Sequence, residues 1–177
     1  SLGGRIPARP RVEIHYQVRR SGIERRADQR PENLGYAALL GRYYMGREEY
    51  ARAAELYGGL AQQAPEDAQA LAFAAQAQYL AAGRSLNDSV RLRAEQALAI
   101  DPELGEAYIP LAWVQFLYDW DFAAAERSHR LAMRLARGDP RAHEAFAFFL
   151  AAMGREHEAM AVVHDGGLHH SSLILNP

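Results

Sequence analysis

Seven histidines and a scatter of carboxylates are the residues of this sequence that could do chemistry. A zinc site on a helix needs two histidines four residues apart with a glutamate between them, or histidines and carboxylates that converge. His143-Glu144 lacks the second histidine. His157 and His164 are seven residues apart, could share a helix face, and have no evident third ligand. We therefore expect surface histidines and no metal site.

Nucleophilic and cofactor chemistry find little support either. The chain has no cysteine, which excludes disulfides, thiolate ligands and cysteine nucleophiles. Nucleophile elbows, phosphate-binding glycine loops and dinucleotide fingerprints are absent. Asp119 and Asp121 flank Trp120 in an expected turn, where capping of the following helix explains them. We expect neither an enzyme nor a bound cofactor.

The elements that would position these residues repeat along the chain. In residues 34–65, six residues fall at positions 7, 8, 11, 20, 24 and 32 of a 34-residue frame: Leu40, Gly41, Tyr44, Ala53, Tyr57 and Pro65. Three further helix pairs follow, over 68–83 with 89–100, 105–118 with 122–135, and 141–153 with 156–163. The pattern resembles the tetratricopeptide repeat (TPR), and missing such a repeat would misassign the whole fold.

Each residue type in the pattern has a packing reason. Small residues at Ala53, Ala125 and Ala159, with Val90 at the equivalent place, let two helices approach closely. Large aromatic residues fill the space between layers. A proline at the end of a helix forces the preceding residue out of helical geometry and turns the chain into the next pair.

The resemblance implies an all-α fold, a right-handed α–α superhelix of about four helix-turn-helix repeats. We expect a TPR domain over residues 32–177, with repeats at approximately 34–67, 68–104, 105–139 and 140–172. A segment of different character precedes it. Residues 1–30 hold eight arginines against three acidic residues, a net charge of +5, so the rest of the chain carries −7.

We expect residues 1–31 to form a basic, extended N-terminal arm. Residues 11–18 alternate apolar and polar side chains, which predicts a strand. A single strand must pair with a second chain, pair with another domain or stay disordered. The arm therefore offers a route to a homo-oligomer. No aromatic stacking platform or recognition helix accompanies the arginines, so we do not expect nucleic-acid binding.

The resemblance places positions 2, 5, 9, 12 and 13 of each first helix on the concave face of the superhelix. In this register, those positions include Ala38 and Gln69 and the candidate groove residues Arg42, Gln76, Tyr79, Trp113, Phe116 and Phe148. Such an aromatic strip with few charges suits a peptide or helix of a partner protein. The alternative is that some of these rings pack inside the solenoid, or that the chain's own tail fills the groove. Repeats that bind acidic chaperone termini use a basic clamp, which this lysine-free chain lacks.

We therefore predict a protein-interaction scaffold that binds a partner segment in its concave groove. The run from Tyr118 to Arg127 also resembles TPR segments of bacterial multidomain regulators, which implies a second hypothesis, a regulatory or self-association module whose effector domain is absent here. Arginine as the sole basic residue beside histidine, with abundant alanine, is typical of a bacterial genome. No apolar run reaches membrane-spanning length, and the lack of cysteine favours the cytoplasm.

Overall fold

The computed structural model describes residues 34–81 and 88–166. These residues form eight helices and contain no strand. The helices are α2 (Leu34–Gly46), α3 (Tyr50–Gln63), α4 (Ala68–Ala81), α5 (Asp88–Ile100), α6 (Gly105–Leu117), α7 (Phe122–Leu135), α8 (Pro140–Ala152) and α9 (Glu156–Asp165). The arm at 1–31 and the strand expected at 11–18 lie outside the described residues.

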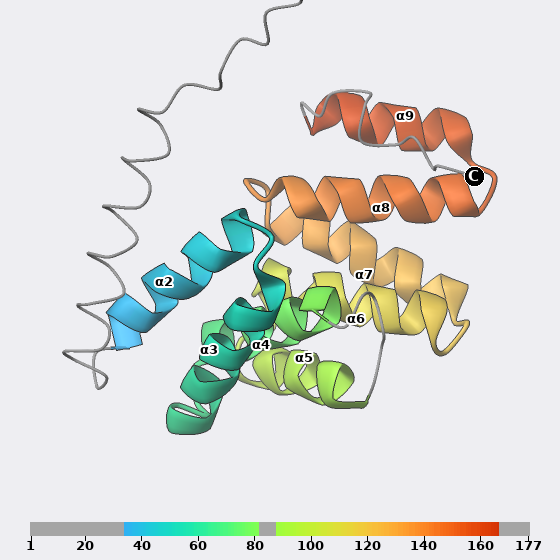
Figure 1. Cartoon of the computed structure of the whole chain (residues 1–177). Coiled ribbons are helices and arrows are strands. Elements are labelled where there is room, and N and C mark those ends of the chain that lie inside the picture. The colour runs from blue at the N-terminus through green and yellow to red at the C-terminus, as the bar shows by residue number, and fades with distance from the viewer. Residues whose placement is uncertain (1–33, 82–87, 167–177) are drawn as a thin grey trace, which may run out of the picture.

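Consecutive helices pack as antiparallel pairs, and the pairs stack along one direction (Figure 1). The first helices of the second, third and fourth pairs, α4, α6 and α8, also pack side by side. At the other end, α2 packs on α3 and diverges from α4. The predicted all-α solenoid of four helix pairs is confirmed.

The small positions of the repeat lie where the helices of each pair meet. Ala53, Val90, Ala125 and Ala159 are all buried. Gly41 serves the same purpose in α2, because an added Cβ would lie 2.5 Å from the ring of Tyr57. The close approach of α2 to α3 therefore depends on the missing side chain at position 41.

Aspartates begin several of the helices. The Asp121 carboxylate accepts a hydrogen bond of 2.9 Å from the Ala124 amide at the start of α7, as expected for a helix cap. Asp139 caps α8 in the same way, with Pro140 as the first helical residue. Proline is well tolerated there because its missing N–H would have no partner within the helix.

One expectation is wrong: His129 does not lie on the surface. It is completely buried in α7, and neither ring nitrogen has a hydrogen-bond partner among the described residues. The rings of Trp113, Phe146 and Phe149 surround it at centroid distances of 5.9, 5.8 and 5.2 Å. Burial lowers the pKa of His129 from 6.5 to about 3, with Glu126 opposing this effect, so the imidazole is neutral.

Within residues 34–81 and 88–166, no group of three or more histidines, aspartates or glutamates could hold a metal ion. Among the same residues, no helix combines the length and the apolar character that crossing a bilayer requires.

Candidate functional site: a cleft and an aromatic cluster on first helices

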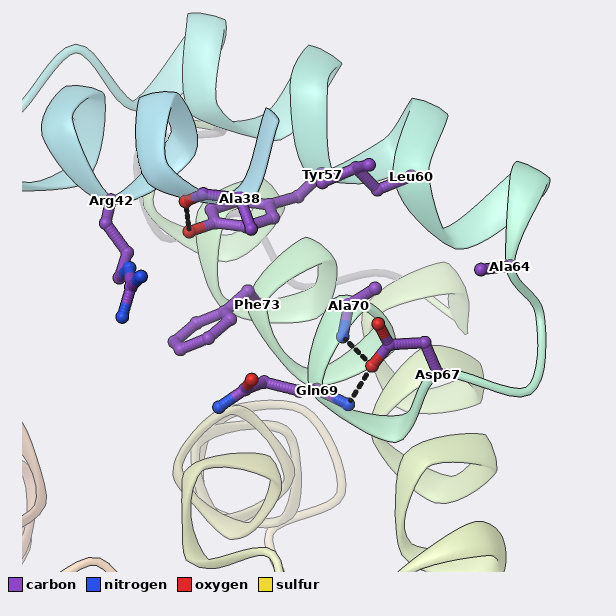
Figure 2. A pocket seen from close by; sticks show the side chains of 9 residues that line it. All are labelled: Ala38, Arg42, Tyr57, Leu60, Ala64, Asp67, Gln69, Ala70 and Phe73. Atoms are coloured by element: carbon purple, nitrogen blue, oxygen red, sulfur yellow. Dashed lines mark hydrogen bonds between the residues drawn. The ribbon is translucent and has the colours of Figure 1, made fainter. Parts of the chain in front are cut away.

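A cleft lies between α2, α3 and α4, where α2 diverges from α4 (Figure 2). Three of the positions expected on the concave face line it: Ala38 and Arg42 from α2, and Gln69 from α4. Phe73 of α4 also faces the cleft. The divergence of α2 from α4 thus leaves an opening on the face that the repeat pattern assigns to partner binding.

The apolar side of this cleft is built on one tyrosine. The Tyr57 hydroxyl donates a hydrogen bond of 3.2 Å to the carbonyl oxygen of Ala38, which fixes the ring beneath α2. Phe73 stacks on Tyr57 at a centroid distance of 5.2 Å. The cavity has a volume of about 60 Å³, well below the several hundred Å³ of a typical small-molecule site. It has room for one side chain of a ligand or for a few waters.

Arg42 supplies the positive charge at the cleft. Its side chain is exposed and makes no hydrogen bond or ion pair with any residue of 34–81 or 88–166. Burial raises the pKa of Tyr57 to about 12, while the charges of Arg42 and Arg141 oppose this rise. Two guanidinium groups therefore act on the same buried hydroxyl, although Arg141 comes from α8.

The second polar feature joins α4 to α8. Arg141 Nη1 donates to the side-chain oxygen of Gln76 at 2.7 Å. The same guanidinium donates hydrogen bonds to both carboxylate oxygens of Asp139, the residue that caps α8, at 2.5 and 2.8 Å. Gln76 is only 2% exposed, so this contact satisfies a buried amide oxygen. Gln76 is therefore committed to an internal contact.

The four candidate aromatic residues come together around Trp113. Tyr79 stacks on it at 5.7 Å, Phe116 lies at 6.2 Å and Phe148 at 5.3 Å, all measured between ring centroids. The rings come from α4, α6 and α8, so one cluster connects the second, third and fourth pairs. Spacing in the sequence thus selected side chains that do meet in space.

Most of this cluster is packed inside the solenoid. Trp113 is 7% exposed, and Tyr79 and Phe116 are also buried, whereas Phe148 is half-buried. Phe148 is therefore the member with the most ring surface left for another molecule, and its ring packs on the buried ring of Trp113. Arg42 lies apart from this cluster, at the cleft.

Sequence reasoning missed Phe73 and Asp139 as site residues, whereas the repeat register placed Arg141 on the concave face, at position 2 of the fourth repeat. The Asp139-Pro140 pair is a recognisable helix start, which could have signalled the cap. No local signal shows that Arg141 reaches a helix two pairs away. Phe73 follows a position of the concave face by one residue, and it faces the cleft because α2 stands away from α4.

The helices with this cleft and cluster form a TPR solenoid, and solved structures share the fold. The crystal structure of TTC0263, a thermophilic TPR protein in Thermus thermophilus, matches with a TM-score of 0.67 at 18% identity, over 88% of this chain and 85% of that chain. A crystal structure of MamA matches with a TM-score of 0.59 at 16% identity, over 93% and 94% of the two chains. At such identities the likeness concerns the fold alone. No family model and no curated protein sequence matches the chain.

Proposed function

We propose that the protein is a non-catalytic interaction scaffold that binds a segment of a partner protein along the first helices of its repeats. The observation that carries this proposal is the cleft between α2, α3 and α4, where the exposed Arg42 and the rings of Tyr57 and Phe73 line the opening. The Asp67 carboxylate also lines it and accepts hydrogen bonds from the amides of Gln69 and Ala70 at the start of α4. Stacked helix pairs form extended concave surfaces, and such surfaces bind extended or helical segments.

The cleft favours a partner with two features. Its volume of about 60 Å³ and the rings of Tyr57 and Phe73 suit one apolar side chain as an anchor. The guanidinium of Arg42 suits a carboxylate close to that anchor, because charge-assisted hydrogen bonds to arginine are among the stronger polar contacts. Further along the first helices, the half-buried Phe148 of α8 offers a second apolar contact. The partner is therefore an acidic segment with apolar anchors.

Peptide selection on the full chain tests this proposal. Peptides chosen from a random library should combine a carboxylate with an apolar residue. Arg42→Ala should weaken the selected peptides by roughly tenfold or more, since a charged hydrogen bond contributes about 1.5–3 kcal/mol. Isothermal titration gives the affinities, and circular dichroism checks that the variant stays folded.

Arg134→Ala is the matched control. Arg134 is an exposed arginine on α7, a second helix of its pair, and does not line the cleft. Its removal changes net charge equally and should leave peptide affinity unchanged. Equal affinities for wild type, Arg42→Ala and Phe148→Ala would show that peptides do not bind on this face.

The regulatory or self-association role is a second candidate function. The observation that favours it is a group of exposed apolar side chains where α6 meets α7, with Trp120 the most exposed of them. A cytoplasmic location accords with the absence of cysteine and belongs to the proposal in either case.

A further inference from the structure

The turn between α6 and α7 exposes a tryptophan in an unfavourable backbone conformation. Trp120 has a φ of 58° and is 72% exposed. Both properties are unfavourable for tryptophan, because bulky side chains disfavour positive φ and large apolar side chains favour burial. An exposed tryptophan held this way needs an explanation other than the fold of the chain alone.

The positive φ belongs to the turn and not to tryptophan. Glu48 in the α2–α3 turn and Gly154 in the α8–α9 turn have φ values of 60° and 75°. Each of the three residues stands two positions before the second helix of its pair. The repeated turn therefore requires this conformation, and glycine satisfies it with least strain. Tryptophan at this position is not needed to build the turn.

The turn is firmly held. The Asp121 amide donates to the Gln115 carbonyl at 2.9 Å, and the Asp121 carboxylate caps α7. Arg91 of α5 donates to the Asp119 carboxylate at 2.5 Å. Trp120 meets Phe122 edge to face at 6.2 Å, and Phe122 in turn contacts the buried Phe116 at 6.0 Å. The exposed indole thus rests on a row of rings that begins in the core.

The neighbours of Trp120 enlarge the apolar surface. We call residues 117–122 the aromatic turn. Besides Trp120, its exposed large apolar residues are Leu117, Tyr118 and Phe122. Concentrated aromatic exposure of this kind is typical of contact surfaces, where tryptophan and tyrosine are the residues that most often dominate binding.

Acidic side chains lie on this turn and act on Arg91 of the neighbouring α5. The hydrogen bond that Arg91 donates to the Asp119 carboxylate and the charges of Glu95 and Asp88 raise the pKa of Arg91, so three carboxylates act on one guanidinium. Asp121 adds a fourth carboxylate on the turn itself. The surface therefore combines exposed aromatic rings with an excess of negative charge.

We propose that the aromatic turn receives residues 11–20 of a second copy of this chain. That segment, RVEIHYQVRR, alternates apolar residues and holds three arginines against one glutamate. Arginine binds favourably over a tryptophan face and to carboxylates, so the segment complements the turn in both charge and ring chemistry. The start of α2 and the aromatic turn lie at opposite sides of the molecule in Figure 1, which favours a second copy over the same chain as the source.

Sedimentation velocity on the full chain tests this proposal. Wild type should associate as concentration rises, and added salt should weaken the association because opposite charges carry part of it. Trp120→Gly should raise the protein concentration at which half of the chains associate by roughly tenfold or more. Its melting temperature should equal or exceed that of wild type, because glycine adopts a positive φ without strain. Glu48→Gly is the matched control, because it makes the same backbone change in another turn and should associate as wild type does.

A mixing experiment identifies the source of the segment. The triple variant Arg11→Ala, Arg19→Ala, Arg20→Ala should fail to associate, as Trp120→Gly does. A mixture of the two should form heterodimers, because one chain keeps an intact segment and the other an intact turn. A monomeric wild type at every concentration, or no rescue on mixing, would overturn the proposal. Arg42→Ala should associate normally, so failure here is distinct from failure of the groove proposal.

Discussion

Arg141, at the start of α8, donates a hydrogen bond to Gln76 in α4 across a sequence separation of 65 residues. The two helices belong to the fourth and second pairs, and α6 packs against both of them. In a simple stack each pair contacts only its neighbours, so this bond is a contact of longer range. It ties together three successive layers of the solenoid.

A double-mutant cycle should detect this tie. Gln76→Leu and Arg141→Met keep apolar bulk while removing the bond. We expect a coupling free energy of about 1–2 kcal/mol in urea unfolding, because the bond is charge-assisted and its acceptor is buried. Arg130→Met serves as comparison. Its ion pair with Glu126 is exposed and should contribute less than about 1 kcal/mol. A coupling near zero would mean that the layers do not depend on the bond.

His129 should make stability fall in mild acid. Its pKa is about 3 in the folded protein and near 6.5 once unfolding exposes it. Between these values the unfolded chain binds the extra proton. The free energy of unfolding therefore keeps its full value above pH 6.5 as far as His129 is concerned. It falls as the pH drops below 6.5, and the loss is complete below about pH 3. The slope is about 1.4 kcal/mol per pH unit.

Urea unfolding of wild type and His129→Phe at several pH values measures this effect. The variant should show a flatter dependence on pH between about 6.5 and 4, since phenylalanine carries no proton and suits the surrounding rings. His157→Gln is the control, because His157 is exposed. Parallel curves for wild type and His129→Phe would argue against a buried neutral imidazole.

Gly41→Ala should destabilise the first helix pair although alanine is the better helix former. The new methyl carbon would lie 2.5 Å from the Tyr57 ring, which is buried and hydrogen-bonded to Ala38. We expect a net loss of about 1–3 kcal/mol in thermal or urea unfolding. Gly59→Ala in α3 has open space around its Cβ and should instead gain up to about 1 kcal/mol. Equal effects of the two changes would contradict the close approach.

The repeat was visible in the sequence because small residues recur where helices must touch. Ala53, Val90, Ala125 and Ala159 mark those contacts, and each is buried. The burial of His129 was not visible, since the rings around it come from α6 and α8 and its own neighbours Ser128 and Arg130 are polar. Helical periodicity reports the face on which a residue lies. It does not report how closely the next helix covers that face.

The same limit applies to the groove. The repeat register identified Trp113 and Phe148 as sharing one face, and they do meet at 5.3 Å. It could not show which of the two rings is buried and which is left partly exposed. This difference in burial determines which residue can contact a partner, because the buried ring of Trp113 packs between α4, α6 and α8.

Substitution of the two rings should separate support from binding. Trp113→Ala removes a buried ring in contact with Tyr79, Phe116 and Phe148, so unfolding should become easier by about 3–5 kcal/mol. Phe148→Ala removes a half-buried ring and should lower stability by roughly half as much. A loss of peptide binding by Trp113→Ala would then reflect a weakened solenoid, whereas a loss by Phe148→Ala in a folded protein would indicate direct contact. If Trp113→Ala instead unfolds at the urea concentration of wild type, its ring does not support the fold, and Trp113 becomes the better candidate for the partner's anchor.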